Sequence, residues 1–179
     1  MTDRHASIYI ATSLDGFIAR ENGDLDWLPV PERGGEDYGY AAFMKSIDAL
    51  VIGRNTYEKA LSFGGWPYGK TRVVVLTTRP LGKLPVGANI EAESGEPAEI
   101  VNRLAATDAR RLYVDGGVTI QRFLTAGMID RLIITQIPVL IGRGIPLFGP
   151  LDRDIELTHV STRSWPNGLV QSEYVVAPR

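Results

Sequence analysis

Cysteine is absent from the sequence, and histidine occurs only at positions 5 and 159. The first absence excludes disulfides, thiolate nucleophiles and cysteine-based zinc sites. The second leaves few candidates for a histidine-activated nucleophile, because His5 lies in a polar leader and His159 in a strand-like run near the end. We therefore expect neither a metal site nor a serine hydrolase.

A basic excess and a long apolar run are also missing. The 19 Lys and Arg residues are balanced by 21 Asp and Glu, so the formal charge of -2 does not favour a nucleic-acid partner. No stretch approaches the ~18 apolar residues of a membrane helix, and the charged N-terminus lacks the apolar centre of a signal peptide. We expect a cytoplasmic protein without a membrane or nucleic-acid partner. The composition, 44% hydrophobic and 22% charged over 179 residues, predicts one globular domain spanning residues 1–179.

Hydrophobic periodicity predicts strands that alternate with helices. Asn55 and Glu58 have the spacing of a capping box, and Asn167-Gly168 separates two alternating runs as in a β-hairpin. The pattern predicts an α/β fold with a mostly parallel sheet and a C-terminal antiparallel hairpin. The expected strands are 8–11, 49–52, 72–77, 112–114 and 131–141, the hairpin is 155–176, and the expected helices are 36–47, 55–61, 97–106 and 117–127.

One segment matches a known phosphate-binding pattern. Gly64, Gly69, Lys70 and Thr71 fit G-x-x-x-x-G-K-[ST], which indicates a nucleotide phosphatase when a strand precedes the loop and a helix follows it. Here we expect the opposite order, so we interpret the segment as a connecting turn. The pattern G-x-G-x-x-G is missing after every expected strand, which excludes a standard Rossmann domain.

Two other turns favour a phosphate-bearing ligand. Residues 53–56 and 115–119 each place glycine where a strand ends and a helix begins, and this geometry presents backbone N–H groups to an anion. Arg54 adds a guanidinium to the first turn. Residues 76–79, with two hydroxyls and an arginine, follow another strand and provide a third anion-binding candidate.

Asp37 is the acid of greatest interest. It follows a loop rich in proline and glycine and begins an amphipathic helix, so its carboxylate either faces a pocket beside the first strand or stabilises the helix N-terminus. Glu36 is the competing candidate. With no cysteine and no well-placed histidine, Asp37 or an ordered water is the expected proton source for any acid–base step.

The segments 10–19, 23–27, 51–58, 74–77, 113–117 and 132–135 together resemble the dihydrofolate reductase superfamily. Their sequences are IATSLDGFIA, GDLDW, VIGRNTYE, VVLT, YVDGG and LIIT. The SLDG motif within the first is closest to the riboflavin-type branch, the small proteins similar to the reductase domain of the bacterial deaminase-reductase. The resemblance implies a three-layer α/β/α fold of the dihydrofolate reductase type. It also implies NADPH as the cofactor and a small-molecule substrate.

The resemblance assigns roles to individual residues. Ala11 and Ile18 would flank the nicotinamide, and Gly53, Arg54 and Thr56 would hold phosphates. Arg54, together with the strand end Leu76, Thr77, Thr78 and Arg79, would recognise the 2′-phosphate of NADPH. The pyrophosphate would lie against Gly116, Gly117, Val118 and Thr119. Asp115 stands where folate reductases have a glycine, and its side chain either tightens the turn or caps the following helix.

For the substrate, the resemblance implies that Asp37 takes the place of a buried substrate-binding carboxylate, supported by Thr135. The implied reaction is that of a 5-amino-6-(5-phosphoribosylamino)uracil reductase, the reduction of a C=N bond or a ribosyl carbonyl in a pyrimidine- or pteridine-like compound. The alternatives are dihydrofolate reductase activity and a non-catalytic NADPH-binding protein. We also expect a homodimer, formed through residues 132–141 and the hairpin.

Overall fold

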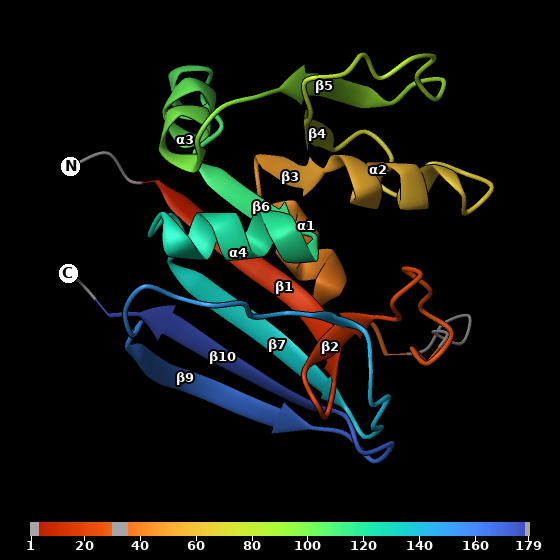
Figure 1. The fold of residues 1–179 in the computed structure, drawn as a ribbon, viewed down its shortest axis with the longest axis vertical. Helices are drawn as coiled ribbons and strands as arrows, with labels where there is room; N and C mark the ends of the chain where they lie inside the picture. Colours follow the sequence, from red (N-terminus) through yellow and green to blue (C-terminus); the bar gives the residue numbers. More distant parts are fainter. Residues whose placement is uncertain (1–3, 30–35, 178–179) are drawn as a thin grey trace.

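The computed structural model describes residues 4–29 and 36–177, which form an α/β fold with one large sheet (Figure 1). The large sheet contains β1 (His5–Ser13), β3 (Ala49–Gly53), β4 (Arg72–Leu76), β5 (Asn89–Glu93), β6 (Arg111–Asp115), β7 (Arg131–Ile137), β9 (Leu157–Ser164) and β10 (Val170–Val176). A small sheet pairs β2 (Phe17–Ala19) with β8 (Ile145–Pro146). The helices are α1 (Tyr40–Ser46), α2 (Arg54–Leu61), α3 (Pro97–Ala106) and α4 (Gly117–Thr125).

The order of strands in the large sheet is β5-β4-β3-β6-β1-β7-β10-β9. The first six are parallel, and β10 joins β7 and β9 in antiparallel pairing. The expected C-terminal hairpin is therefore confirmed, with a turn around Asn167 and Gly168. Because parallel strands share a direction, the ends of β1, β3 and β6 open on the same rim of the sheet.

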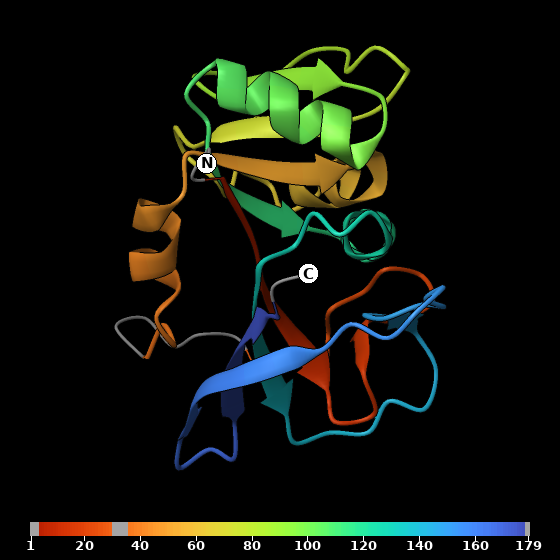
Figure 2. The same cartoon turned by 90° about the vertical axis from the view of Figure 1, so that its left-hand side faces the viewer.

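Two apolar cores cover the two faces of the sheet, which gives the expected three layers. Val51, Ile100 and Phe123 belong to the core beneath α3 and α4, whereas Phe43 and Tyr57 belong to the core beneath α1 and α2. Neighbouring strand residues alternate between the two faces. Figure 2 shows α1 on one side of the sheet and α3 and α4 on the other.

The structure differs from the sequence-based elements at several places: β1 extends over His5–Ser13, and the short strands β2 and β8 were not expected. The edge strand β5 was missed, because the run NIEAE has no apolar stretch. The first helix begins at Tyr40 rather than near Asp37. Asn55 and Glu58 do not form a capping box, since Gly53 is the N-cap of α2 and Glu58 pairs with Arg54. The strand β7 ends at Ile137, before Pro138, which has no N–H for a ladder hydrogen bond.

Candidate functional site

A large cavity lies at the rim where β1, β3 and β6 end. It has a volume of about 520 Å³ and is lined from α2, α4 and the segment around β2 as well as from these strands. Of the residues predicted to bind the cofactor, ten line it: Ala11, Ile18, Gly53, Arg54, Thr56, Leu76, Gly116, Gly117, Val118 and Thr119. The structure thus brings together segments that are more than 100 residues apart in the sequence.

The two strand-to-helix turns predicted to bind phosphate lie against each other. A Cβ atom on Gly53 would lie 2.8 Å from Oγ1 of Thr119, and a Cβ atom on Gly116 would collide with Oγ1 of Thr56. Gly116 also has a φ of +95°, which side chains disfavour. Each turn therefore needs glycine because the other helix approaches it closely.

The first turns of both helices present backbone N–H groups to this cavity. Neither Gly53 nor Gly116, the N-caps of α2 and α4, provides a side-chain cap. Uncapped N–H groups and the positive ends of two helix dipoles favour an anion between them. The predicted phosphate site is thus a paired structure, built from both turns.

Arg54 joins the first turn to the predicted third anion-binding segment. Its Nε donates to Glu58 at 2.7 Å, and its Nη1 donates to the carbonyl oxygen of Pro80 at 2.9 Å. This places the guanidinium beside the loop that follows β4. Thr77, Thr78 and Arg79 lie in that loop and do not line the cavity, so their contact with a 2′-phosphate stays a prediction.

Asp37 does not lie in the cavity. Its carboxylate accepts hydrogen bonds from the N–H groups of Gly39 and Ala41, both at 2.9 Å, at the start of α1. The side chain is exposed, and the backbone donors lower the pKa of the Asp37 carboxyl. The expected arrangement with Thr135 is absent as well. Thr135 is buried and accepts a hydrogen bond from Nε2 of Gln171 at 2.9 Å. The Asp37 carboxylate therefore stabilises the N-terminus of α1, which is the second of the two alternatives drawn from the sequence.

Asp115 is a half-buried acid that sequence reasoning did not select as the proton source. It ends β6 and lines the cavity, and its Oδ1 accepts a hydrogen bond from the N–H of Gly116 at 2.8 Å, which tightens the turn. Burial raises the pKa of Asp115 to about 6, although the bond from Gly116 acts in the opposite direction. A carboxyl directly after the buried run of residues 112–114 was the available signal in the sequence.

Aromatic side chains form one part of the cavity lining. Tyr9, Tyr68 and Tyr113 line it together with Asp115, and the Tyr113 hydroxyl donates to the carbonyl oxygen of Tyr9 at 2.7 Å. Sequence reasoning missed Tyr9, which belongs to no motif, and Tyr68, which occupies a variable position of the segment interpreted as a connecting turn.

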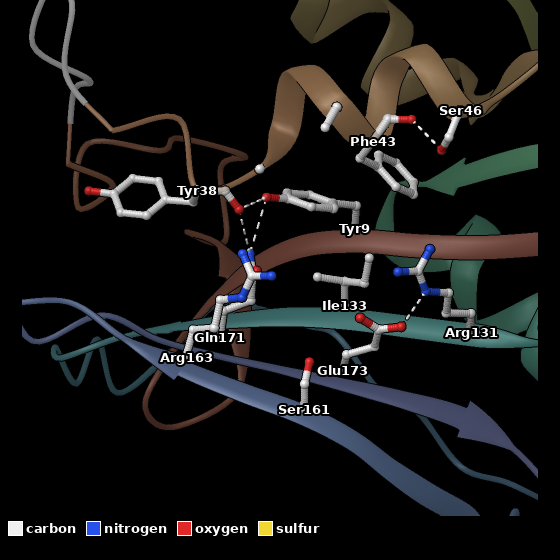
Figure 3. Close-up of a pocket in the computed structure, with 12 residues that line it drawn as sticks. Tyr9, Tyr38, Phe43, Ser46, Arg131, Ile133, Ser161, Arg163, Gln171 and Glu173 are labelled. Carbon is white, nitrogen blue, oxygen red and sulfur yellow. Dashed lines mark hydrogen bonds and ion pairs between the residues drawn. The ribbon is translucent and has the colours of Figure 1, made fainter.

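A second cavity, of about 320 Å³, lies between α1 and the strands β7, β10 and β9 (Figure 3). Here Gln171 donates to the hydroxyl of Tyr9 at 3.1 Å and to the carbonyl oxygen of Tyr38 at 3.2 Å. Arg131 pairs with Glu173 at 2.7 Å. This network fixes the start of α1 to the hairpin. Tyr9 lines both cavities.

The segment from Gly64 to Thr71 lies between α2 and β4. The order is helix, loop, strand, the reverse of what a phosphate-binding loop needs, and the interpretation as a connecting turn is confirmed.

Comparisons with known proteins identify the family. The family model described as the RibD C-terminal domain matches residues 4–171. The chain belongs to the RibD C-terminal domain family. This confirms the resemblance drawn from the sequence motifs. No helix among the described residues has the length and apolar character needed to cross a membrane.

Three similar proteins show how closely this member of the RibD C-terminal family matches known chains. The uncharacterized protein YwjB of Bacillus subtilis is 34% identical, over 98% of this chain and 99% of its own length. A putative riboflavin biosynthesis protein from Shewanella sp. PV-4 has a TM-score of 0.89 and 39% identity, with 97% and 99% coverage. The dihydrofolate reductase of Enterococcus faecalis, solved with NADP(H), has a TM-score of 0.62 at 20% identity and 99% coverage of each chain. That last likeness confirms the dihydrofolate reductase-like fold.

Proposed function

We propose that this RibD C-terminal family protein is a cytoplasmic, NADPH-dependent reductase that acts on a pyrimidine- or pteridine-like compound. The observation that carries the proposal is the pair of interlocked turns at Gly53 and Gly116. They leave a cradle of uncapped N–H groups where a pyrophosphate fits, and a Cβ at either glycine would fill the contact between them. The dihydrofolate reductase of E. faecalis, which has the same fold, was solved with NADP(H).

The residues that line the rest of the large cavity suit the other parts of the cofactor. Arg54 would hold a phosphate beside the loop after β4, and Ala11 and Ile18 would pack on the nicotinamide ring. The bound cofactor supplies a hydride, which the protein has no other group to provide. The chain itself orients the ring, excludes water and delivers a proton.

Asp115 is the proton source in this proposal, and it replaces Asp37. Reduction of a C=N bond adds a hydride to carbon and a proton to nitrogen. An acid with a pKa of about 6 keeps part of its population protonated near neutral pH, and it regains its proton from solvent after transfer. Asp37 is ionised at that pH because two backbone N–H groups stabilise its carboxylate and lower its pKa.

A pair of matched variants tests this assignment. We expect the wild-type protein to oxidise NADPH with 5-amino-6-(5-phosphoribosylamino)uracil or with dihydrofolate. Asp115→Asn removes the acid, so kcat should fall by about 10²- to 10⁴-fold. Asp37→Asn keeps a good helix cap and should leave kcat nearly unchanged.

Steady-state kinetics of the three proteins with both compounds give the answer. Failure of both compounds to drive NADPH oxidation would contradict the proposed reaction. Equal losses in the two variants would contradict the role of Asp115.

A further inference from the structure

The loop that matches the phosphate-binding pattern positions two aromatic side chains in the structure. Residues 62–71 carry Trp66 and Tyr68, whose rings meet edge to face with centroids 5.2 Å apart. Trp66 also packs against Tyr57, which is 1% exposed, with centroids 6.0 Å apart. The N–H of Thr71 donates to the carbonyl oxygen of Tyr68 at 3.0 Å, which closes the loop. The loop is therefore anchored on the core, and it holds Tyr68 in the wall of the large cavity.

Tyr68 and Asp115 act on each other across that cavity. Burial raises the pKa of Tyr68, and the negative charge of Asp115 raises it further. Tyr40, beside them, has its pKa raised to about 12 by burial and then by Asp115, and the pKa of the buried Tyr113 is also raised. The hydroxyl of Tyr68 thus stays protonated over the whole neutral range and is a hydrogen-bond donor.

Two residues that line the cavity have hydrogen-bonding atoms without a partner among the described residues. Within residues 4–29 and 36–177, the Tyr68 hydroxyl forms no hydrogen bond, and Asp115 uses only Oδ1, toward Gly116. Oδ2 is left for a ligand. When Asp115 is protonated, the site offers two donors, one from each residue, beside the aromatic surfaces of Tyr9 and Tyr113.

We propose that Tyr68 is a specificity-determining residue that selects flat heterocycles with two neighbouring acceptors, a ring nitrogen and a carbonyl oxygen. The ring nitrogen accepts from Asp115 and the carbonyl oxygen accepts from the Tyr68 hydroxyl, while the ring packs on tyrosine. This proposal rests on the proposed function, because it requires the ring to lie beside the cofactor. It excludes rings that present an N–H where the acceptor nitrogen should be, since two donors would then face each other.

Two isosteric probes separate the two contacts. Lumazine (pteridine-2,4-dione) has a ring nitrogen, N5, beside the 4-carbonyl group, and 5-deazalumazine (pyrido[2,3-d]pyrimidine-2,4-dione) has C–H in place of that nitrogen alone. Binding is measured by fluorescence and calorimetry at pH 5.5, with the protein saturated with NADP⁺ so that no turnover occurs. We expect lumazine to bind the wild-type protein about tenfold more tightly than 5-deazalumazine, because 5-deazalumazine cannot form the hydrogen bond to the ring nitrogen.

The variant Tyr68→Phe removes only the hydroxyl and should weaken both probes about tenfold, because both have the carbonyl group. The matched control is Tyr174→Phe, whose ring packs on His159 in the hairpin and does not line the large cavity. It should leave both affinities unchanged.

Equal affinities of wild type and Tyr68→Phe for lumazine would overturn the role of Tyr68. Equal affinities of the wild type for the two probes would overturn the ring-nitrogen contact. If NADP⁺ binds and lumazine does not, this inference fails and the proposed function stands. If NADP⁺ itself does not bind, the proposed function fails.

Discussion

At the residue scale, the molecule separates two acids that look alike in the sequence. Asp37 lies two residues before Gly39 and Asp115 directly precedes Gly116, and both acids are near the start of a helix. Asp37 is exposed and satisfied by backbone donors, whereas Asp115 is packed at a strand end with one oxygen unpaired by any described residue. Local patterns indicate that both are near helix starts. Only the arrangement of the sheet decides which of them faces the cleft, so the catalytic assignment could not be made from the sequence.

The raised pKa of Asp115 has a consequence for stability. In the folded protein this pKa is about 6, against an ordinary value of 3.8, so the folded state binds more protons than the unfolded state between these values. The free energy of unfolding therefore falls as the pH rises from 4 to 6. The difference between the two pKa values corresponds to at most about 3 kcal/mol in the free energy of unfolding. At neutral pH this contribution to stability is lost in full.

We therefore expect Asp115→Asn to be more stable than the wild type at pH 7.5, by up to about 3 kcal/mol, and equally stable near pH 3.5. Urea denaturation at the two pH values measures the difference. The gain in stability would accompany the loss of turnover proposed above, as is common where an active site holds a buried polar group. A variant that is less stable than the wild type at pH 7.5 would show that the ionised carboxyl of Asp115 does not destabilise the folded state.

At the scale of elements, the sequence predicted the strands and helices with clear periodicity and the turns that join them. Residues 49–52 and 73–76 are all apolar, and Gly53 and Gly116, at the ends of β3 and β6, mark the helix starts. The order of elements was also enough to reject the apparent phosphate loop at Gly64. The polar edge strand β5 could not be predicted from the sequence, because it is a strand through its pairing with β4 and not through its own sequence pattern.

We propose that the expected homodimer forms through the hairpin and not through β7. β7 lies between β1 and β10, so its backbone is already paired and Leu132 is 1% exposed. β9 is the edge strand on the hairpin side of the large sheet, and its Leu157 and Val160 are 42% and 51% exposed. An exposed edge with apolar side chains favours pairing with a second copy.

We predict that light scattering of the purified protein gives twice the chain mass of 19.6 kDa. Val160→Asp should convert the protein to monomers, because a charge in the contact would lose its water. An unchanged circular dichroism spectrum provides the control. A monomeric wild type would overturn the dimer, and a variant that stays dimeric would place the contact elsewhere.

At the scale of the whole molecule, the parallel part of the large sheet and its antiparallel hairpin have different roles. The parallel strands end at one rim and form the large cavity there, while the antiparallel hairpin extends the sheet at its C-terminal edge (Figure 1). Parallel sheets commonly bind ligands beyond the carboxyl ends of their strands. The motifs in the sequence predicted this rim and most residues of the phosphate cradle. The tyrosine-lined end came only from the three-dimensional structure, because it combines β1, β6 and an irregular loop.

The central claim is that the cradle between Gly53 and Gly116 binds NADPH. The most direct test is a tryptophan-fluorescence titration with NADPH, NADH and ATP, for which Trp66 is a natural reporter because it packs on Tyr68 in the cavity wall. The wild type is compared with Gly116→Ala, whose Cβ would collide with Thr56, and with Gly65→Ala, whose Cβ meets no atom within 4 Å. Thermal unfolding confirms that each variant is folded.

The account predicts saturable binding of NADPH, weaker binding of NADH, no preference for ATP, and a loss of NADPH binding in Gly116→Ala but not in Gly65→Ala. A wild-type protein that does not bind NADPH, or that binds ATP more tightly, would contradict it.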